Sequence, residues 1–398
     1  MSSSSPKLPE HRDIRPMGSS YWSHQPGTAL YTAFFVLFTL VRLPCLCLRY
    51  SIPDFRPDSQ WTYRRSVSRT LFMYVCHYLA TVKFQPVFNL KADREKKRFV
   101  IIEPERMESF RSILLCDPSI SPGQVGAVWS PTPISTPEVY RAGQRVFLHL
   151  HGGAYVLGSA RDIDMGFATS LLLKHSPDCA VFCPEYRLAS LPGCRFPPAL
   201  QDAVTAYDHL ITHLKIPAEN IVFSGDSAGA HLILALLRYV NTHSDIFPEP
   251  GAVLLWSPWP DMSIDVEIAD DRPATHVDHV APKLIAWTYR DFLPQECTNV
   301  PRSNPYLSPS KARIPTRSPI WVQWGSDEVL KEDIEKLIAV QTSVCDGERA
   351  ARLSTYEVPH APHDIFALAP LLGWKSEADA AVQQAIDFLR QCKEETSD

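Results

Sequence analysis

The 398-residue sequence lacks several features that mark particular classes of protein. Its formal net charge is -5, so it has no basic excess of the kind that binds nucleic acid. Its ten cysteines are dispersed, and no pair has the spacing and histidine company of a zinc site. No asparagine begins an Asn-x-Ser/Thr sequon, and no internal repeat is present. We therefore expect a globular protein with buried free thiols, no metal and no nucleic-acid partner.

The length exceeds that of one average domain, which has roughly 100–200 residues. The predicted organisation is a disordered tail, an apolar anchor helix, a cap or linker segment, and a core that is interrupted by a cap insertion. The tail is expected at 1–28, the anchor helix at 29–48 and the cap or linker segment at 49–96. The core is expected at 97–264 and 311–398, and the cap insertion at 265–310.

The anchor is predicted because Ala29–Leu48 is apolar over its whole length except at Arg42 and Pro44. Twenty residues at about 1.5 Å each would cross a bilayer core of about 30 Å. No small-x-small cleavage site follows, which argues against a removed signal peptide. The alternative is a cap helix whose apolar face packs over the core. We prefer membrane attachment through 29–48, as a single span or at the interface.

Basic residues are more numerous after the apolar segment than before it. The positive-inside rule then places the main domain in the cytosol. The residues concerned are Arg42, Arg49, Arg56, Arg64, Arg65 and Arg69 on one side, and Lys7, Arg12 and Arg15 on the other.

From residue 99 onward, short apolar runs alternate with helix-like stretches. The runs VFLHL, AVFCPEY, IVFS, AVLLWS and IWVQWG are typical of buried strands, and helical periodicity follows several of them. Strands that alternate with helices predict an α/β protein with a mostly parallel sheet covered on both faces.

One serine stands between two glycines, at the junction of a predicted strand and a predicted helix. In GDSAG, Ser227 would occupy a sharp turn, and the flanking glycines would relieve crowding there. Such a turn holds the hydroxyl clear of the sheet at a helix N-terminus, where developing negative charge is favoured. The alternative is an ordinary N-cap serine. We interpret Ser227 as a nucleophile, provided that a base and an acid accompany it.

Candidate partners follow in the order acid, then histidine. Asp327 and Glu328 come after IWVQWG, and we prefer Asp327 because it is the first acid past the strand. His360 and His363 come after LSTYEV, and we prefer His363 because a helix beginning at Asp-Ile-Phe would anchor it.

The stretch HGGA, after VFLHL, supplies candidate donors for an oxyanion. Two glycines let the N–H groups of Gly152 and Gly153 point into a site, and the N–H of Ala228 would complete the set. His151 is expected to brace the loop by hydrogen bonds.

In combination, HGGAYVLGS, EYRLA, FPPALQDA, GDSAGAHL, NPYLSP and GSDEVLKED resemble the hormone-sensitive-lipase-like branch of the α/β hydrolases. The resemblance runs from about Arg145 to the C-terminus. Two features depart from the family pattern: Ala154 replaces a third glycine, and PHAPHDIF replaces the commoner His-Gly-Phe. The apolar N-terminus and the HDIF ending also resemble fungal members, some of which serve secondary metabolism.

The resemblance implies an α/β-hydrolase fold with a helical cap and a serine esterase that acts on short-chain or acetyl esters of a small hydrophobic metabolite. Ser227, Asp327 and His363 would form the triad, with no cofactor. Two alternatives keep the fold: an acyltransferase, and a non-catalytic binding protein of the kind known among plant hormone receptors. A trypsin-like protease is excluded because its nucleophile would follow both partners in the chain.

Overall fold

A computed structural model describes residues 21–263, 277–295, 298–343 and 352–397. The tail expected at 1–28 and the insertion expected at 265–310 therefore lie partly outside the described residues. The helices are α1 (Gly27–Ser51), α2 (Tyr63–Val82), α3 (Asp162–His175), α4 (Pro198–Asp208), α5 (Ala228–Thr242), α7 (Pro282–Phe292), α8 (Lys331–Thr342), α9 (Ile365–Leu372) and α10 (Lys375–Ser397). The strands are β1 (Phe99–Ile102), β2 (Val125–Ser130), β3 (Val146–Leu150), β4 (Ala180–Glu185), β5 (Ile221–Asp226), β6 (Ala252–Trp256), β7 (Ile320–Gly325) and β8 (Leu353–Val358).

Within these described ranges the strands form one eight-stranded sheet in the order β1-β2-β4-β3-β5-β6-β7-β8. The pairs β1–β2 and β2–β4 are antiparallel, and every other pair is parallel. The register sets Leu150 beside Gly225, Asp226 beside Trp256, and Gly325 beside Val358. The loops that follow β3, β5, β6, β7 and β8 therefore leave the sheet at one edge, where α/β proteins place their sites.

Alternation along the central strands divides the core between the two faces of the sheet. In β3, Val146 and Leu148 contact one apolar cluster, whereas Phe147 contacts the other. This is the two-residue period that a strand buried on both faces requires. Helices α4, α5 and α8 contribute to the first cluster, and α3, α9 and α10 contribute to the second.

Helix α5 packs closely against the end of β3 because its second residue is glycine. A Cβ at Gly229 would lie 1.9 Å from the carbonyl oxygen of Leu150, which no side chain tolerates. The start of α5 is thereby fixed beside the loop that follows β3.

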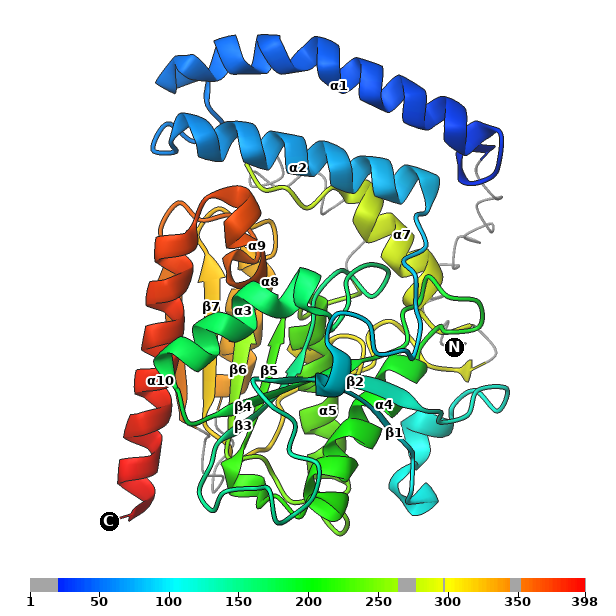
Figure 1. Ribbon diagram of the computed structural model, residues 1–398, viewed down its shortest axis with the longest axis vertical. Helices are drawn as coiled ribbons and strands as arrows, with labels where there is room; N and C mark the ends of the chain where they lie inside the picture. The colour runs from blue at the N-terminus through cyan, green and yellow to red at the C-terminus, as the bar shows by residue number, and fades with distance from the viewer. Residues whose placement is uncertain (1–20, 264–276, 296–297, 344–351, 398) are drawn as a thin grey trace, which may run out of the picture.

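The N-terminal helices form a layer at one end of the molecule. Helix α1 lies along α2, and α2 contacts α7 and α9 on its other side (Figure 1). The side-chain hydroxyl of Thr62 caps α2 by accepting from the N–H of Arg65 at 3.3 Å, and Lys83, directly after α2, adopts the left-handed conformation. Helix α1 is long and apolar enough to cross a membrane by length and composition, yet only Gly27, Leu46 and Tyr50 of it are buried.

Trp61 joins the segment before α2 to the core, and we predict that it is a main source of that segment's stability. Its ring is 1% exposed and packs edge to face on Trp374, with 5.0 Å between ring centroids. Trp61→Ala should lower the free energy of unfolding by about 3–5 kcal/mol, measured by urea denaturation. Phe55→Ala, at a ring that is 52% exposed, is the control. Equal effects of the two variants would contradict the assignment.

Candidate active site

Ser227 lies at the junction of β5 and α5 in a strained backbone conformation. Its φ is 51° and its ψ is -116°, a region that residues with side chains rarely occupy. The turn is held by its main chain: the Ser227 N–H donates to the carbonyl of Trp256 at 2.8 Å, and the Ser227 carbonyl accepts from the N–H of Trp259 at 3.2 Å. The strain is therefore paired with hydrogen bonds that fix the hydroxyl above the end of the sheet.

The structure brings His363 to this hydroxyl. His363 lies in the loop between β8 and α9, and its Nε2 is 2.7 Å from Ser227 Oγ. The next residue, Asp364, caps α9 by accepting from the N–H of Ala367 at 3.3 Å. The helix thus anchors this histidine, as the sequence pattern indicated.

Glu328 supplies the carboxylate for His363. Its Oε2 is 3.0 Å from His363 Nδ1, and its Oε1 accepts from the Ser257 hydroxyl at 2.5 Å and from the Gly325 N–H at 2.6 Å. The residue is 1% exposed. A carboxylate held this way fixes the imidazole so that Nδ1 carries the proton and Nε2 faces the hydroxyl.

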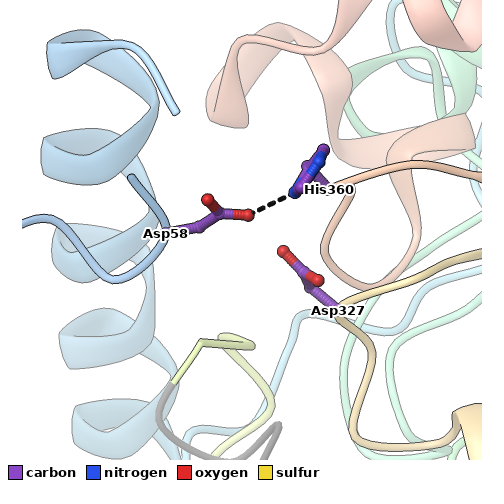
Figure 2. A group of neighbouring side chains, drawn as sticks. All are labelled: Asp58, Asp327 and His360. Atoms are coloured by element: carbon purple, nitrogen blue, oxygen red, sulfur yellow. Dashed lines mark hydrogen bonds and ion pairs between the residues drawn. The ribbon is translucent and has the colours of Figure 1, made fainter. Parts of the chain in front are cut away.

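The geometry therefore supports Glu328 as the acid that accompanies His363, instead of Asp327, which we preferred from the sequence. Figure 2 shows the Asp327 carboxylate pointing toward Asp58 and His360. After β7 the chain turns, with the Glu328 N–H donating to the Gly325 carbonyl and the Asp327 N–H donating to the Ala361 carbonyl. Adjacent side chains leave this turn in different directions, and the longer glutamate reaches back to the histidine. The first acid past the strand is not the one that faces the base.

His360, the alternative base, belongs to this separate group. Its Nδ1 is 2.6 Å from Asp58 Oδ2, and its ring is half exposed. Ligand atoms of Asp58, Asp327 and His360 lie within 4.8 Å of one another, the spacing of a possible metal site. Burial, together with the neighbouring Asp58 carboxylate, raises the pKa of Asp327 to about 6. Shared protons among two acids and a histidine explain this spacing as well as a bound metal does. We therefore assign no metal to the group.

The pKa values of His363 and Glu328 both lie above their ordinary values. Burial by itself lowers the pKa of His363, but the hydrogen bond and the charge of Glu328 outweigh it and leave this pKa above its ordinary value. Burial raises the pKa of Glu328, and His363 opposes that effect. The carboxylate thus favours the imidazolium that forms when His363 takes a proton.

The predicted oxyanion donors are placed unequally. The N–H of Gly152 donates to Asp226 Oδ2 at 2.8 Å, so it is already engaged. No hydrogen bond between described residues uses the N–H groups of Gly153, Ala154 or Ala228. A Cβ at Gly152 would lie 3.2 Å from the Ser227 Cβ, so this loop borders the hydroxyl. The geometry leaves Gly153 and Ala228 as candidate donors and adds Ala154, which has a φ of 56°.

A buried polar network beneath the serine was not found from the sequence. His149 lies in β3, with its Nδ1 2.9 Å from Ser224 Oγ and its Nε2 3.0 Å from Asp226 Oδ1. Asp226 in turn holds Gly152, which ties the loop after β3 to the serine turn. The only signal was a single histidine in an otherwise apolar run. His151 does brace its loop: its Nδ1 lies 2.7 Å from the Gly152 carbonyl, and its ring stacks on Tyr186.

A strained serine at a strand–helix turn, with an imidazole on its hydroxyl, is the arrangement of α/β proteins that use a nucleophilic serine. The chain belongs to the α/β hydrolase family, because a family model described as the alpha/beta hydrolase fold matches residues 147–365. The expected α/β-hydrolase fold, with its mostly parallel sheet flanked by helices, is thereby confirmed.

Similar proteins are named as esterases. An acetyl-hydrolase of Streptomyces hygroscopicus is 31% identical over 199 residues, which cover 50% of this chain and 62% of that protein. An esterase of Acinetobacter venetianus is 27% identical, over 49% of this chain and 60% of its own length. The chain thus spans less than two thirds of these curated relatives. The structure of an esterase/lipase from an uncultured bacterium matches with a TM-score of 0.54 and 27% identity, over 67% of this chain and 81% of that one.

We predict that Glu328, and not Asp327, controls the protonation of His363. In Glu328→Gln the negative charge that stabilises the imidazolium is lost, so the pKa of His363 should fall. Asp327→Asn, the matched control one residue away, should leave that pKa nearly unchanged. NMR titration of the His363 imidazole measures both. A larger fall in Asp327→Asn would show that the acid has been wrongly chosen.

Proposed function

We propose that this protein is a serine carboxylic-ester hydrolase with Ser227, His363 and Glu328 as its triad. The observation that carries the proposal is the continuous contact from Ser227 Oγ through His363 to Glu328, at 2.7 and 3.0 Å. A serine hydroxyl is a poor nucleophile until a neutral imidazole can take its proton. This contact provides the base, and the buried carboxylate orients it.

The reaction proceeds by two acyl transfers. Ser227 Oγ attacks the ester carbonyl while His363 Nε2 takes the hydroxyl proton, and the carbonyl oxygen becomes an oxyanion. The N–H groups of Gly153, Ala154 and Ala228 stabilise that charge, and His363 then gives the proton to the leaving alcohol. Water, deprotonated by His363, attacks the acyl-enzyme, and Ser227 regains its proton as the acid leaves. The loss of one oxyanion donor typically costs about 10²–10³ in rate.

Short-chain or acetyl esters of a small hydrophobic alcohol are the proposed substrates. Ser227 is only 7% exposed. Trp259, whose N–H donates to the Ser227 carbonyl, and Met262, three residues further on, are buried and apolar. Such surroundings suit a small acyl group and exclude water from it. The similarity to an acetyl-hydrolase agrees with this substrate class. We also propose a role in fungal secondary metabolism, on the resemblance of the apolar N-terminus and the HDIF ending to fungal members.

We predict that Ser227→Ala lowers the hydrolysis of p-nitrophenyl acetate by about 10⁴-fold or more, because it removes the attacking hydroxyl. His363→Ala should be comparably damaging, while its control His360→Ala should stay within about tenfold of the original rate. A fluorophosphonate should label the unaltered protein and not Ser227→Ala. Retained hydrolysis in Ser227→Ala would refute the function, and acyl transfer to an added alcohol in preference to water would make it an acyltransferase.

We further propose that α1 attaches the protein to a membrane surface, with the main domain in the cytosol. Leu30, Phe34, Leu37 and Val41 follow one face of the helix and are 57–64% exposed. On the opposite face, Thr32 bonds Tyr78 of α2 at 2.8 Å, so α1 is seated on α2. A helix seated along its neighbour suits insertion into the interface better than a full span, which would require α1 to leave α2.

Charges on this outward face should release the protein from lipid. We predict that Leu37→Glu combined with Val41→Glu lowers sedimentation with phosphatidylcholine–phosphatidylserine vesicles by about tenfold or more, since charged groups are costly in lipid. The control pair is Val87→Glu with Ile163→Glu, at apolar side chains that are 86% and 82% exposed elsewhere. If both pairs sediment as the unaltered protein does, α1 is not the attachment.

A further inference from the structure

One buried carboxylate lies between the two loops that carry Glu328 and His363. Asp278 precedes α7, and its side chain is fully buried. Its Oδ1 accepts from the His363 N–H at 3.1 Å and from the His279 N–H at 2.7 Å. Its Oδ2 accepts from the N–H of Val329, the residue after Glu328, at 2.9 Å. The two oxygens thus bind the main chains of both loops.

The Asp278 bridge controls the distance between Glu328 and His363, on which the site depends. Glu328 follows β7 and His363 follows β8, so their separation is set by two loops outside the sheet register. Hydrogen bonds to an ionised carboxylate are roughly twice as strong as neutral ones. A displacement of about 1 Å in catalytic geometry can cost about 10²-fold in rate. The Asp278 carboxylate holds the two loops together beside their functional side chains.

Helix α2 holds Asp278 from the outer side. The guanidinium of Arg69 donates to the Asp278 carbonyl oxygen, and Arg69 is itself only 3% exposed. Next to it, Phe72 of α2 packs edge to face on His279, with ring centroids 5.0 Å apart. At the other end of the segment, Trp61 Nε1 donates to the His360 carbonyl at 2.6 Å, three residues before the base. The N-terminal segment therefore contacts the histidine loop and the Asp278 bridge together.

We propose that Asp278 is a positioning residue for the triad and that Arg69 of α2 holds it in place, which makes α2 a part of the catalytic unit. The proposal rests on the proposed function, because it concerns the same serine site. Asp278 does not touch the reacting atoms. It acts through the main chains of Val329 and His363.

Asp278 also contributes to the electrostatics of the base. Its charge, with those of Glu328 and Asp226, favours the protonated form of His363, against the effect of burial. The neutral ring of His279 also faces His363, at 5.9 Å between centroids, and burial lowers the pKa of His279 to about 3. Removal of the Asp278 charge should lower the pKa of His363. Because the base must be neutral, the acidic limb of the rate profile should then move to lower pH.

Asp278→Asn in the full chain tests the proposal. An amide keeps one acceptor but presents N–H to the N–H of a loop, so the bridge is lost on one side. We expect kcat for p-nitrophenyl acetate to fall by about 10–100-fold with little change in KM, and the acidic limb to move to lower pH. The control is Asp178→Asn, at a carboxylate that is 96% exposed. A variant with lowered Tm but with kcat within twofold of the original and an unmoved limb would overturn the proposal.

The variant Arg69→Lys provides a second test of the proposal, and it leaves Asp278 and the triad unaltered. Lysine lacks the planar fork of arginine, so its contact with the Asp278 carbonyl should weaken. We expect a fall in kcat of about 3–10-fold at constant KM, against Arg141→Lys as the exposed control. An unchanged kcat in Arg69→Lys overturns the role of α2. If Asp278→Asn does not fold, the kcat of Arg69→Lys is the measurement that tests the proposal. Ser227→Ala separates the two proposals. If Ser227→Ala stays active, the proposed function fails. If Ser227→Ala is inactive while Asp278→Asn and Arg69→Lys keep the original kcat, the positioning role fails and the proposed function stands.

Discussion

The hydrogen bond between His363 Nε2 and Ser227 Oγ, at 2.7 Å, requires two loops from different strands to meet with little tolerance. The serine has little freedom, because its turn is strained and its main chain is bonded to the last residue of β6 and to the loop that follows. The imidazole has equally little, since Glu328 holds its other nitrogen and Asp278 holds its main chain. Catalytic geometry in this protein is therefore a consequence of buried carboxylates that fix backbone N–H groups.

Buried acids recur around the serine, and each of them bonds the backbone. Asp226 binds the N–H of Gly152, Glu328 binds that of Gly325, and Asp278 binds those of Val329 and His363. Burying a carboxylate is costly unless it is well bonded, so such groups persist where geometry matters more than stability. The same arrangement explains why Gly152 cannot serve an oxyanion: its N–H is used to position the loop that carries Gly153 and Ala154.

The sequence predicted the parts of the fold and site that depend on pattern. Alternating strands and helices, the turn at Ser227 and the helix after His363 each follow from local chemistry that a single chain displays. The preference between Asp327 and Glu328 could not be settled that way, because it depends on the direction of two adjacent side chains in a tertiary turn. Asp278 was hidden for the same reason, since its partners are main-chain groups of distant loops. The pattern Glu328-Val-Leu, an acid directly before a buried apolar pair, was a usable signal for the acid.

A crystal structure of the full chain after reaction with a p-nitrophenyl phosphonate would test the central claim most directly. The account predicts phosphorus bonded to Ser227 Oγ, with a phosphoryl oxygen within hydrogen-bond distance of the N–H groups of Gly153 and Ala228. It also predicts Glu328 on His363 Nδ1, and Asp327 still facing Asp58. Phosphorus on another residue, or His363 turned toward Asp327 in the adduct, would contradict it.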